Sequence, residues 1–122
     1  MSYDICFGVK VEGMNGYIAV VDEPVYSNPT YNLRDMFVAC MGWDYEQGVW
    51  YNCAEVLPKF ERGVHELRFS SEKYKKYNAP NGWGTVGSAL KVLESVLKKA
   101  QEIVDGNWTW NKIPLEHLWI RW

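Results

Sequence analysis

Residues 86–104 read VGSALKVLESVLKKAQEIV, and the spacing of their apolar side chains decides the class of fold. These side chains recur at steps of four, three, four, three and four residues, the period of one face of an α-helix. The members are Val86, Leu90, Leu93, Leu97, Ala100 and Val104. Thr85 suits the N-cap and Gly106 the position after the last turn, so the sequence predicts a long amphipathic helix between them.

Two shorter helices are predicted upstream by the same period. The apolar face of the first consists of Leu33, Met36, Phe37, Cys40 and Met41. Thr30 or Asn32 can cap its N-terminus, and Gly42 suits its C-terminal end. The apolar face of the second consists of Leu57, Phe60, Val64 and Leu67.

Pro58 sets the expected start of that second helix. Proline is tolerated best at the first helical position, where its missing N–H has no partner to lose. We therefore expect the helix to begin near Leu57 and residues 53–56 to form a separate turn. A further short helical piece is expected over residues 70–77, and residues 43–52 are expected to form an aromatic loop.

Strands are predicted at both ends of the chain. The first residues alternate between apolar and polar side chains, as a half-buried strand does. Its apolar members are Tyr3, Ile5, Phe7, Val9 and Val11. Residues 12–16, EGMNG, supply turn chemistry, and the β-branched residues in 17–21 predict a returning strand, which completes a hairpin. Residues 115–122 are expected to form a terminal strand that pairs with the hairpin.

The order of these elements predicts an α+β fold. We expect a small, mainly antiparallel sheet, formed by the N-terminal hairpin plus the C-terminal strand, with three to four helices packed on one face. A length of 122 residues suits one domain, so residues 1–122 are expected to form a single domain.

The composition excludes several classes of protein. Hydrophobic residues make up 48% of the chain and charged residues 23%, which fits neither a disordered chain nor a membrane protein. A formal net charge of −2 offers no basic excess for general nucleic-acid binding. The sequence shows no leader-like opening and no apolar run of about 18 residues, so we expect a cytoplasmic protein.

The cysteines, histidines and carboxylates of the sequence do not form a known catalytic or metal-binding motif. The three cysteines, at positions 6, 40 and 53, are far apart and are predicted to be buried free thiols. His65 and His117 fall in separate elements, a helix and the terminal strand. Asp44 and Glu46 share the aromatic loop and could act as an acid and a base, but carboxylates in a loop are more commonly only solvated. The sequence therefore predicts no catalytic residue, no metal and no cofactor.

Aromatic residues are unusually abundant. The chain has 7 Trp, 8 Tyr and 4 Phe, or 16% of its residues. Several of these rings fall in stretches predicted to be irregular, at 26–31, 43–51, 83 and 108–110. Because loops often carry binding residues, this surplus predicts an aromatic binding surface.

Two loops that precede helices are candidate binding sites. Residues 81–85, NGWGT, join a glycine-rich turn to the long helix, where unpaired N–H groups and the helix dipole favour an anion. Trp83 lies between two glycines and is placed for stacking on a ring. The alternative is a tight turn with Trp83 in the core and Thr85 as a cap. Residues 28–32, NPTYN, form a second such loop, whose asparagine amides suit a base edge or a ribose.

Four segments resemble a family of small phage-encoded proteins, and the likeness spans the whole chain. The segments are MSYDI at 1–5, TYNLRDM at 30–36, NGWG at 81–84 and IPLEHLW at 113–119. Small phage proteins of this kind include inhibitors of host defence, and one class of them sequesters nucleotide immune signals such as those of the Thoeris and CBASS defences.

The resemblance implies an anti-defence protein that sequesters a small nucleotide signal, ADP-ribose-like or cyclic, without chemistry. The ligand-binding residues are then Tyr31, Trp43 and Trp83 for stacking, Arg34 with the Gly84 and Thr85 amides for phosphate, Asn32 and Asn81 for ribose or base edges, and Gly82 in the same turn. The alternatives are a protein-binding inhibitor that uses exposed aromatics and a small hydrolase of the same signals. Exposed aromatics also suggest a homodimer as one possible state.

Overall fold

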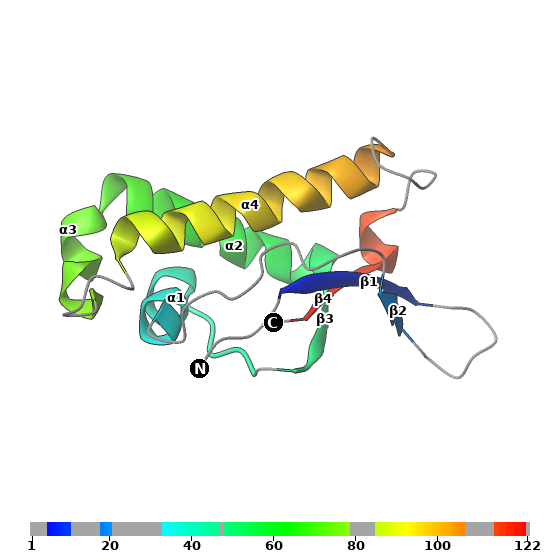
Figure 1. The fold of residues 1–122 in the computed structure, drawn as a ribbon, viewed down its shortest axis with the longest axis horizontal. Helices are drawn as coiled ribbons and strands as arrows, with labels where there is room; N and C mark the ends of the chain where they lie inside the picture. The colour runs from blue at the N-terminus through cyan, green and yellow to red at the C-terminus, as the bar shows by residue number, and fades with distance from the viewer. Residues whose placement is uncertain are drawn as a thin grey trace.

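The computed structural model describes residues 5–10, 18–20, 33–46, 48–78, 85–106 and 114–121, and these form an α+β fold, as predicted (Figure 1). The strands are β1 (Cys6–Lys10), β2 (Ile18–Val20), β3 (Trp50–Asn52) and β4 (Leu118–Arg121). The helices are α1 (Arg34–Met41), α2 (Cys53–Phe69), α3 (Ser71–Tyr74) and α4 (Val86–Asp105), with 3-10 turns η2 (Lys75–Tyr77) and η3 (Leu115–His117). Helices α2 and α4 run antiparallel, side by side (Figure 1).

The sheet has the strand order β2-β1-β4-β3, and every neighbouring pair is antiparallel. The predicted hairpin and C-terminal strand are confirmed: β1 pairs with β2 on one side and with β4 on the other, where Phe7 lies opposite Ile120. Ile5, Phe7, Leu118 and Ile120 are buried and form the inner face of the sheet. The core therefore lies between this face and the helices.

Two expectations for the sheet are wrong. Residues 50–52, expected in the aromatic loop, form the edge strand β3, which is too short for an alternating pattern to reveal. Residues 115–117, expected in the terminal strand, form η3, because the His117 amide donates a hydrogen bond to the Pro114 carbonyl and closes a turn. His117 is therefore an exposed residue of a 3-10 turn rather than of a strand.

Helix α1 has the predicted apolar face, and all five of its members are buried. Its C-terminal end is also as predicted, since Gly42 adopts the left-handed conformation with φ 63°. The N-terminal end differs. The cap position is Leu33, which makes no side-chain capping bond, whereas Thr30 and Asn32 lie outside the described residues.

Helix α2 begins at Cys53, not near Leu57, so the expected turn over 53–56 is wrong. Asn52 caps the helix by accepting a hydrogen bond from the Ala54 amide at 3.0 Å. Pro58 then lies inside the helix, where it removes one backbone hydrogen bond. Burial of Cys53 and Val56 in the core, together with the cap, offsets that loss.

Helix α4 has the predicted limits, because Thr85 caps it and Gly106 ends it with φ 74°. The face of α4 that is most deeply buried is rotated slightly about the helix axis relative to the predicted face. The buried residues are Ala89, Val92, Leu93, Val96, Ala100 and Ile103. Most of the predicted stripe, including Leu90, Leu97 and Val104, is half-buried along the edge of that face. None of the helices in the described residues is long and apolar enough to cross a membrane.

Gly63 lies where three helices meet. A Cβ atom at this position of α2 would lie 2.7 Å from Leu93 Cδ1 of α4 and 2.8 Å from Met41 Cγ of α1. Both of these neighbours are buried, so neither has room to move aside. The missing side chain is therefore what allows α1 and α4 to pack against the same turn of α2.

Tyr74 fixes α3 against α2. Its hydroxyl donates a hydrogen bond to Glu66 Oε1 at 3.0 Å, and its ring is buried. This hydrogen bond, helped by the Lys73 ammonium, lowers the pKa of Glu66 below its usual 4.5. Burial, followed by the hydrogen bond to Glu66, raises the pKa of Tyr74 to about 12.

We predict that Gly63→Ala destabilises the protein, whereas Gly87→Ala does not. The first change gains helix propensity but overpacks the core, at a cost of about 1–3 kcal/mol. Gly87 lies in the first turn of α4, where, among the described residues, a Cβ would meet only Thr85 Oγ1 at 3.8 Å, so alanine there is expected to stabilise by up to about 1 kcal/mol. Urea unfolding of both variants measures the difference, and a Gly63→Ala protein as stable as wild type would contradict the packing argument.

We also predict that the effect of Tyr74→Phe depends on pH. Because the folded-state pKa of Glu66 is lowered, its stabilisation is present above the unfolded-state pKa and is lost as the pH falls through the folded-state value. Tyr74→Phe should therefore lower the free energy of unfolding at neutral pH and lower it less in acid below 4.5. Tyr77→Phe, in η2, is the matched control. If Tyr74→Phe lowered the free energy of unfolding by the same amount across this pH range, the effect would not depend on the charge of Glu66, which would contradict the prediction.

Candidate functional site

Three of the predicted ligand-binding residues lie within the described residues: Arg34, Trp43 and Thr85. The others, Tyr31, Asn32, Asn81, Gly82, Trp83 and Gly84, lie outside them. The geometry therefore bears on the last residue of the 81–85 loop and on Arg34 and Trp43, which follow the 28–32 loop in the sequence.

Arg34 is the first residue of α1 and has one polar atom that no other described residue meets. Its Nη2 donates to Asp44 Oδ1 at 3.0 Å, and its guanidinium lies over the Tyr45 ring at 4.6 Å. Its Nη1 is buried, yet among the described residues no acceptor meets it. A buried donor without an acceptor loses its hydrogen bonds to water and gains none within the protein. This nitrogen is therefore a candidate contact for a ligand.

Trp43 belongs to a cluster of aromatic rings. Its ring centroid lies 4.8 Å from that of Tyr51, 5.4 Å from that of Tyr45 and 6.0 Å from that of Phe60. Tyr45 and Phe60 are buried, and Trp43 is half-buried. Arg34 and Trp43 therefore flank the same ring, that of Tyr45.

This cluster corrects the expectation that the aromatics of residues 43–51 are surplus to the core. Tyr45 is fully buried, and Tyr51 is held in place because its hydroxyl accepts a hydrogen bond from the Glu46 amide at 2.9 Å. Trp50 packs against the Arg121 guanidinium at 5.0 Å. A segment that carries aromatics at irregular spacing can fold inward, which its composition alone does not reveal.

Thr85 acts as a cap, in agreement with the alternative interpretation of its loop. Its hydroxyl accepts a hydrogen bond from the Ser88 amide at 3.2 Å. Asn78 supplies a second cap, since its Oδ1 accepts from the Val86 amide at 3.0 Å. An anion at this helix end would have to compete with both side chains.

Catalytic chemistry finds little support among the described side chains. No group of three His, Cys, Asp or Glu in the described part of the chain could hold a metal ion. Asp44 is 84% exposed and pairs with Arg34, and His65 is exposed on α2. The three cysteines are buried and free, as predicted, and burial raises the pKa of both Cys40 and Cys53 from 9.0 to about 12. These two thiols are therefore poor nucleophiles.

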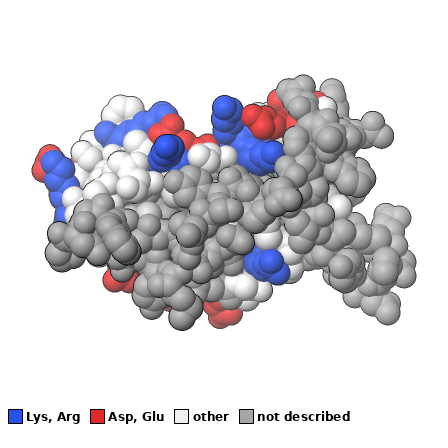
Figure 2. All heavy atoms as spheres, in the orientation of Figure 1, with Lys and Arg blue, Asp and Glu red and all other residues white. Residues whose placement is uncertain are grey.

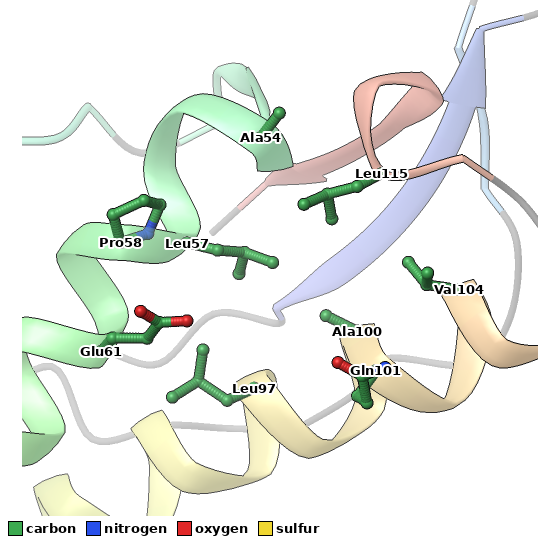
Figure 3. Close-up of a pocket in the computed structure, with 9 residues that line it drawn as sticks. All are labelled: Ala54, Leu57, Pro58, Glu61, Leu97, Ala100, Gln101, Val104 and Leu115. Carbon is green, nitrogen blue, oxygen red and sulfur yellow. The ribbon is translucent and has the colours of Figure 1, made fainter.

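A groove that the sequence did not predict lies between α2 and α4 and is closed at one end by η3 (Figure 3). Its volume is about 280 Å³, and its lining includes Leu57, Glu61, Leu97, Gln101, Val104 and Leu115. Thr85 and Leu97 are twelve positions apart along the chain, or about 18 Å of helix, so Leu97 and the groove it lines lie well away from the N-terminus of α4. The sequence shows only that Leu97 and Val104 belong to the apolar stripe of α4. The structure shows that both are half-buried and line the groove.

No family model, curated protein or solved structure matches this chain. The assignment of a function therefore depends on the residues and their geometry. Basic side chains on the face shown in Figure 2 lie mainly along α3 and α4 and have acidic side chains among them. Arg68 of α2, for example, pairs with Glu94 of α4 at 3.1 Å.

We predict that Cys40 and Cys53 resist thiol reagents in the native protein. Both are fully buried and have raised pKa values, so neither forms a thiolate at neutral pH. Labelling with a chromogenic disulfide should proceed at the unfolding rate in buffer and at once in denaturant. Fast labelling of either residue in the folded protein would contradict its burial and would make that cysteine a candidate nucleophile.

Proposed function

We propose that this protein binds a small nucleotide-type ligand, ADP-ribose-like or cyclic, and sequesters it without chemical change. The setting that the sequence resemblance suggests is a phage protein that blocks a nucleotide signal of host defence in the cytoplasm. The observation that carries the proposal is the buried Nη1 of Arg34, which no acceptor among the described residues meets, on an arginine that contacts the same Tyr45 ring as the half-buried Trp43.

Arginine suits this role because its planar guanidinium binds phosphate through two parallel hydrogen bonds. Arg34 has one nitrogen committed to Asp44, a carboxylate that is itself 84% exposed. A phosphate would satisfy Nη1 and compete with Asp44 for Nη2. Tyr31 and Asn32 lie three and two positions before this arginine in the sequence and supply a ring and an amide for a base and a ribose.

A protein-binding inhibitor is the second candidate, and Phe69 favours it. This residue ends α2 and is 74% exposed, with its ring 4.9 Å from that of His65. An exposed aromatic pair can act as an anchor in a partner's pocket. Under this alternative, Phe69→Ala abolishes inhibition of the host factor, while nucleotides leave the melting temperature unchanged.

We predict opposite effects for two variants that break the same ion pair. Arg34→Gln should weaken nucleotide binding at least tenfold, because it removes the phosphate donor. Asp44→Asn should preserve or strengthen binding, because it removes the competing carboxylate. Calorimetric titration with ADP-ribose and a panel of cyclic nucleotides measures both. Arg68→Gln is the matched control, since Arg68 also pairs with a carboxylate but lies on α2.

Two results would overturn the proposal. One is the absence of binding to every nucleotide in the panel. The other is an equal loss of binding in Arg34→Gln and Asp44→Asn, which would mean that the ion pair only supports the fold. Mass spectrometry of the ligand released on denaturation separates sequestration from hydrolysis, because sequestration returns the nucleotide intact.

A further inference from the structure

We propose that the groove between α2 and α4 is a second binding site, which takes a small amphipathic amine: a primary ammonium group joined to a compact apolar body. This inference is independent of the nucleotide proposal, because it concerns other residues and a ligand of opposite charge.

The walls of the groove suit the apolar body. Leu57 projects from α2, Leu97 and Val104 from α4, and Leu115 from η3, so apolar side chains from three elements face one space (Figure 3). Ala100 is small and leaves room at the base of the groove. A hydrocarbon chain or a single ring that enters would remove both its own surface and these side chains from water.

The polar groups of the groove suit a cation. The Glu61 carboxylate lies at the end of the groove opposite η3 and extends from α2 into the space between the two helices, near Leu97 (Figure 3). Among the described residues no ion pair to Glu61 is formed, and none of the groove's lining residues is basic. The Gln101 amide nitrogen donates to Asp105 Oδ1 at 2.9 Å, so this side chain offers a ligand its oxygen. Two acceptors in a lining that contains no basic residue favour an N–H donor with positive charge.

The size and charge of the groove exclude the larger ligands considered above. A volume of about 280 Å³ lies at the lower limit of small-molecule sites, which commonly span about 300–1,000 Å³. A nucleotide would also bring its phosphates close to Glu61, and like charges repel. The groove therefore fits a compact amine better than a nucleotide or a peptide.

Methyl NMR on the full chain with labelled leucine and valine tests the site, with phenethylamine as the probe. We expect saturable shifts at the methyl groups of Leu57, Leu97, Val104 and Leu115. Leu33 and Leu67 are buried elsewhere in the core and should not shift. The neutral analogue 2-phenylethanol should bind more weakly, and 3-phenylpropionate should not bind.

Two substitutions separate the charge from the shape of the site. Glu61→Gln should weaken phenethylamine about fivefold and leave 2-phenylethanol unchanged, as expected for a partly exposed ion pair. Glu55→Gln, at an exposed position of the same helix outside the lining, should change neither. Leu97→Trp should fill the groove and abolish binding of both probes.

Three results would overturn the proposal. They are the absence of saturable shifts at the groove methyls with millimolar phenethylamine, equal affinity for the amine and the carboxylate, and an amine affinity unchanged by Glu61→Gln. Glu61 is exposed, so its variant should fold, and the dispersed spectrum recorded in the same experiment verifies this.

Discussion

The rest of the structure depends on the close approach of three helices at Gly63. With no side chain there, Met41 of α1 and Leu93 of α4 both reach the backbone of α2. One face of α2 is buried from Cys53 to Leu67. Most of the stability of helices in proteins comes from such packing rather than from propensity, so burial of this face, which includes Cys53 and Val56, also explains why α2 tolerates a proline.

The sheet is joined to this helical layer at the start of α2. Asn52 closes β3, caps α2 and donates through Nδ2 to the Glu116 carbonyl of η3 at 2.8 Å. One residue thus links the edge of the sheet, the first turn of the helix and the turn that leads into β4. The groove lies next to this link, where Ala54 and Ala100 are the small residues of the two helices.

The sequence predicted those features that depend on local patterns. The faces of α1 and α2, the caps of α4, the hairpin and the C-terminal strand all follow from periodicity and turn residues within a short window. The start of α2 was missed because Pro58 is a strong local signal that burial of Cys53 and Val56 overrides. Strand β3 was missed because three residues carry no period, and its pairing with β4 joins positions far apart in the chain.

The candidate site was predictable only in part, for a similar reason. Arg34 and Trp43 can be chosen as candidates from their residue types, and the structure places both against the Tyr45 ring. The inward packing of Tyr45 and the capping of α4 by Asn78 depend on tertiary contacts that no local pattern contains. The groove likewise forms only where α2, α4 and η3 meet. Of its lining residues, the sequence pattern indicates only those in the apolar stripes of α2 and α4.

Native-state hydrogen exchange tests the central role of the helix junction most directly. The account predicts that amides in the middle turns of α2, around Gly63, and of α4, around Leu93, exchange only through global unfolding. Their free energies of opening should then equal the free energy of unfolding from denaturant titration. Exchange of these amides through a lower-energy local opening, while the amides of β1 and β4 stay protected, would contradict it.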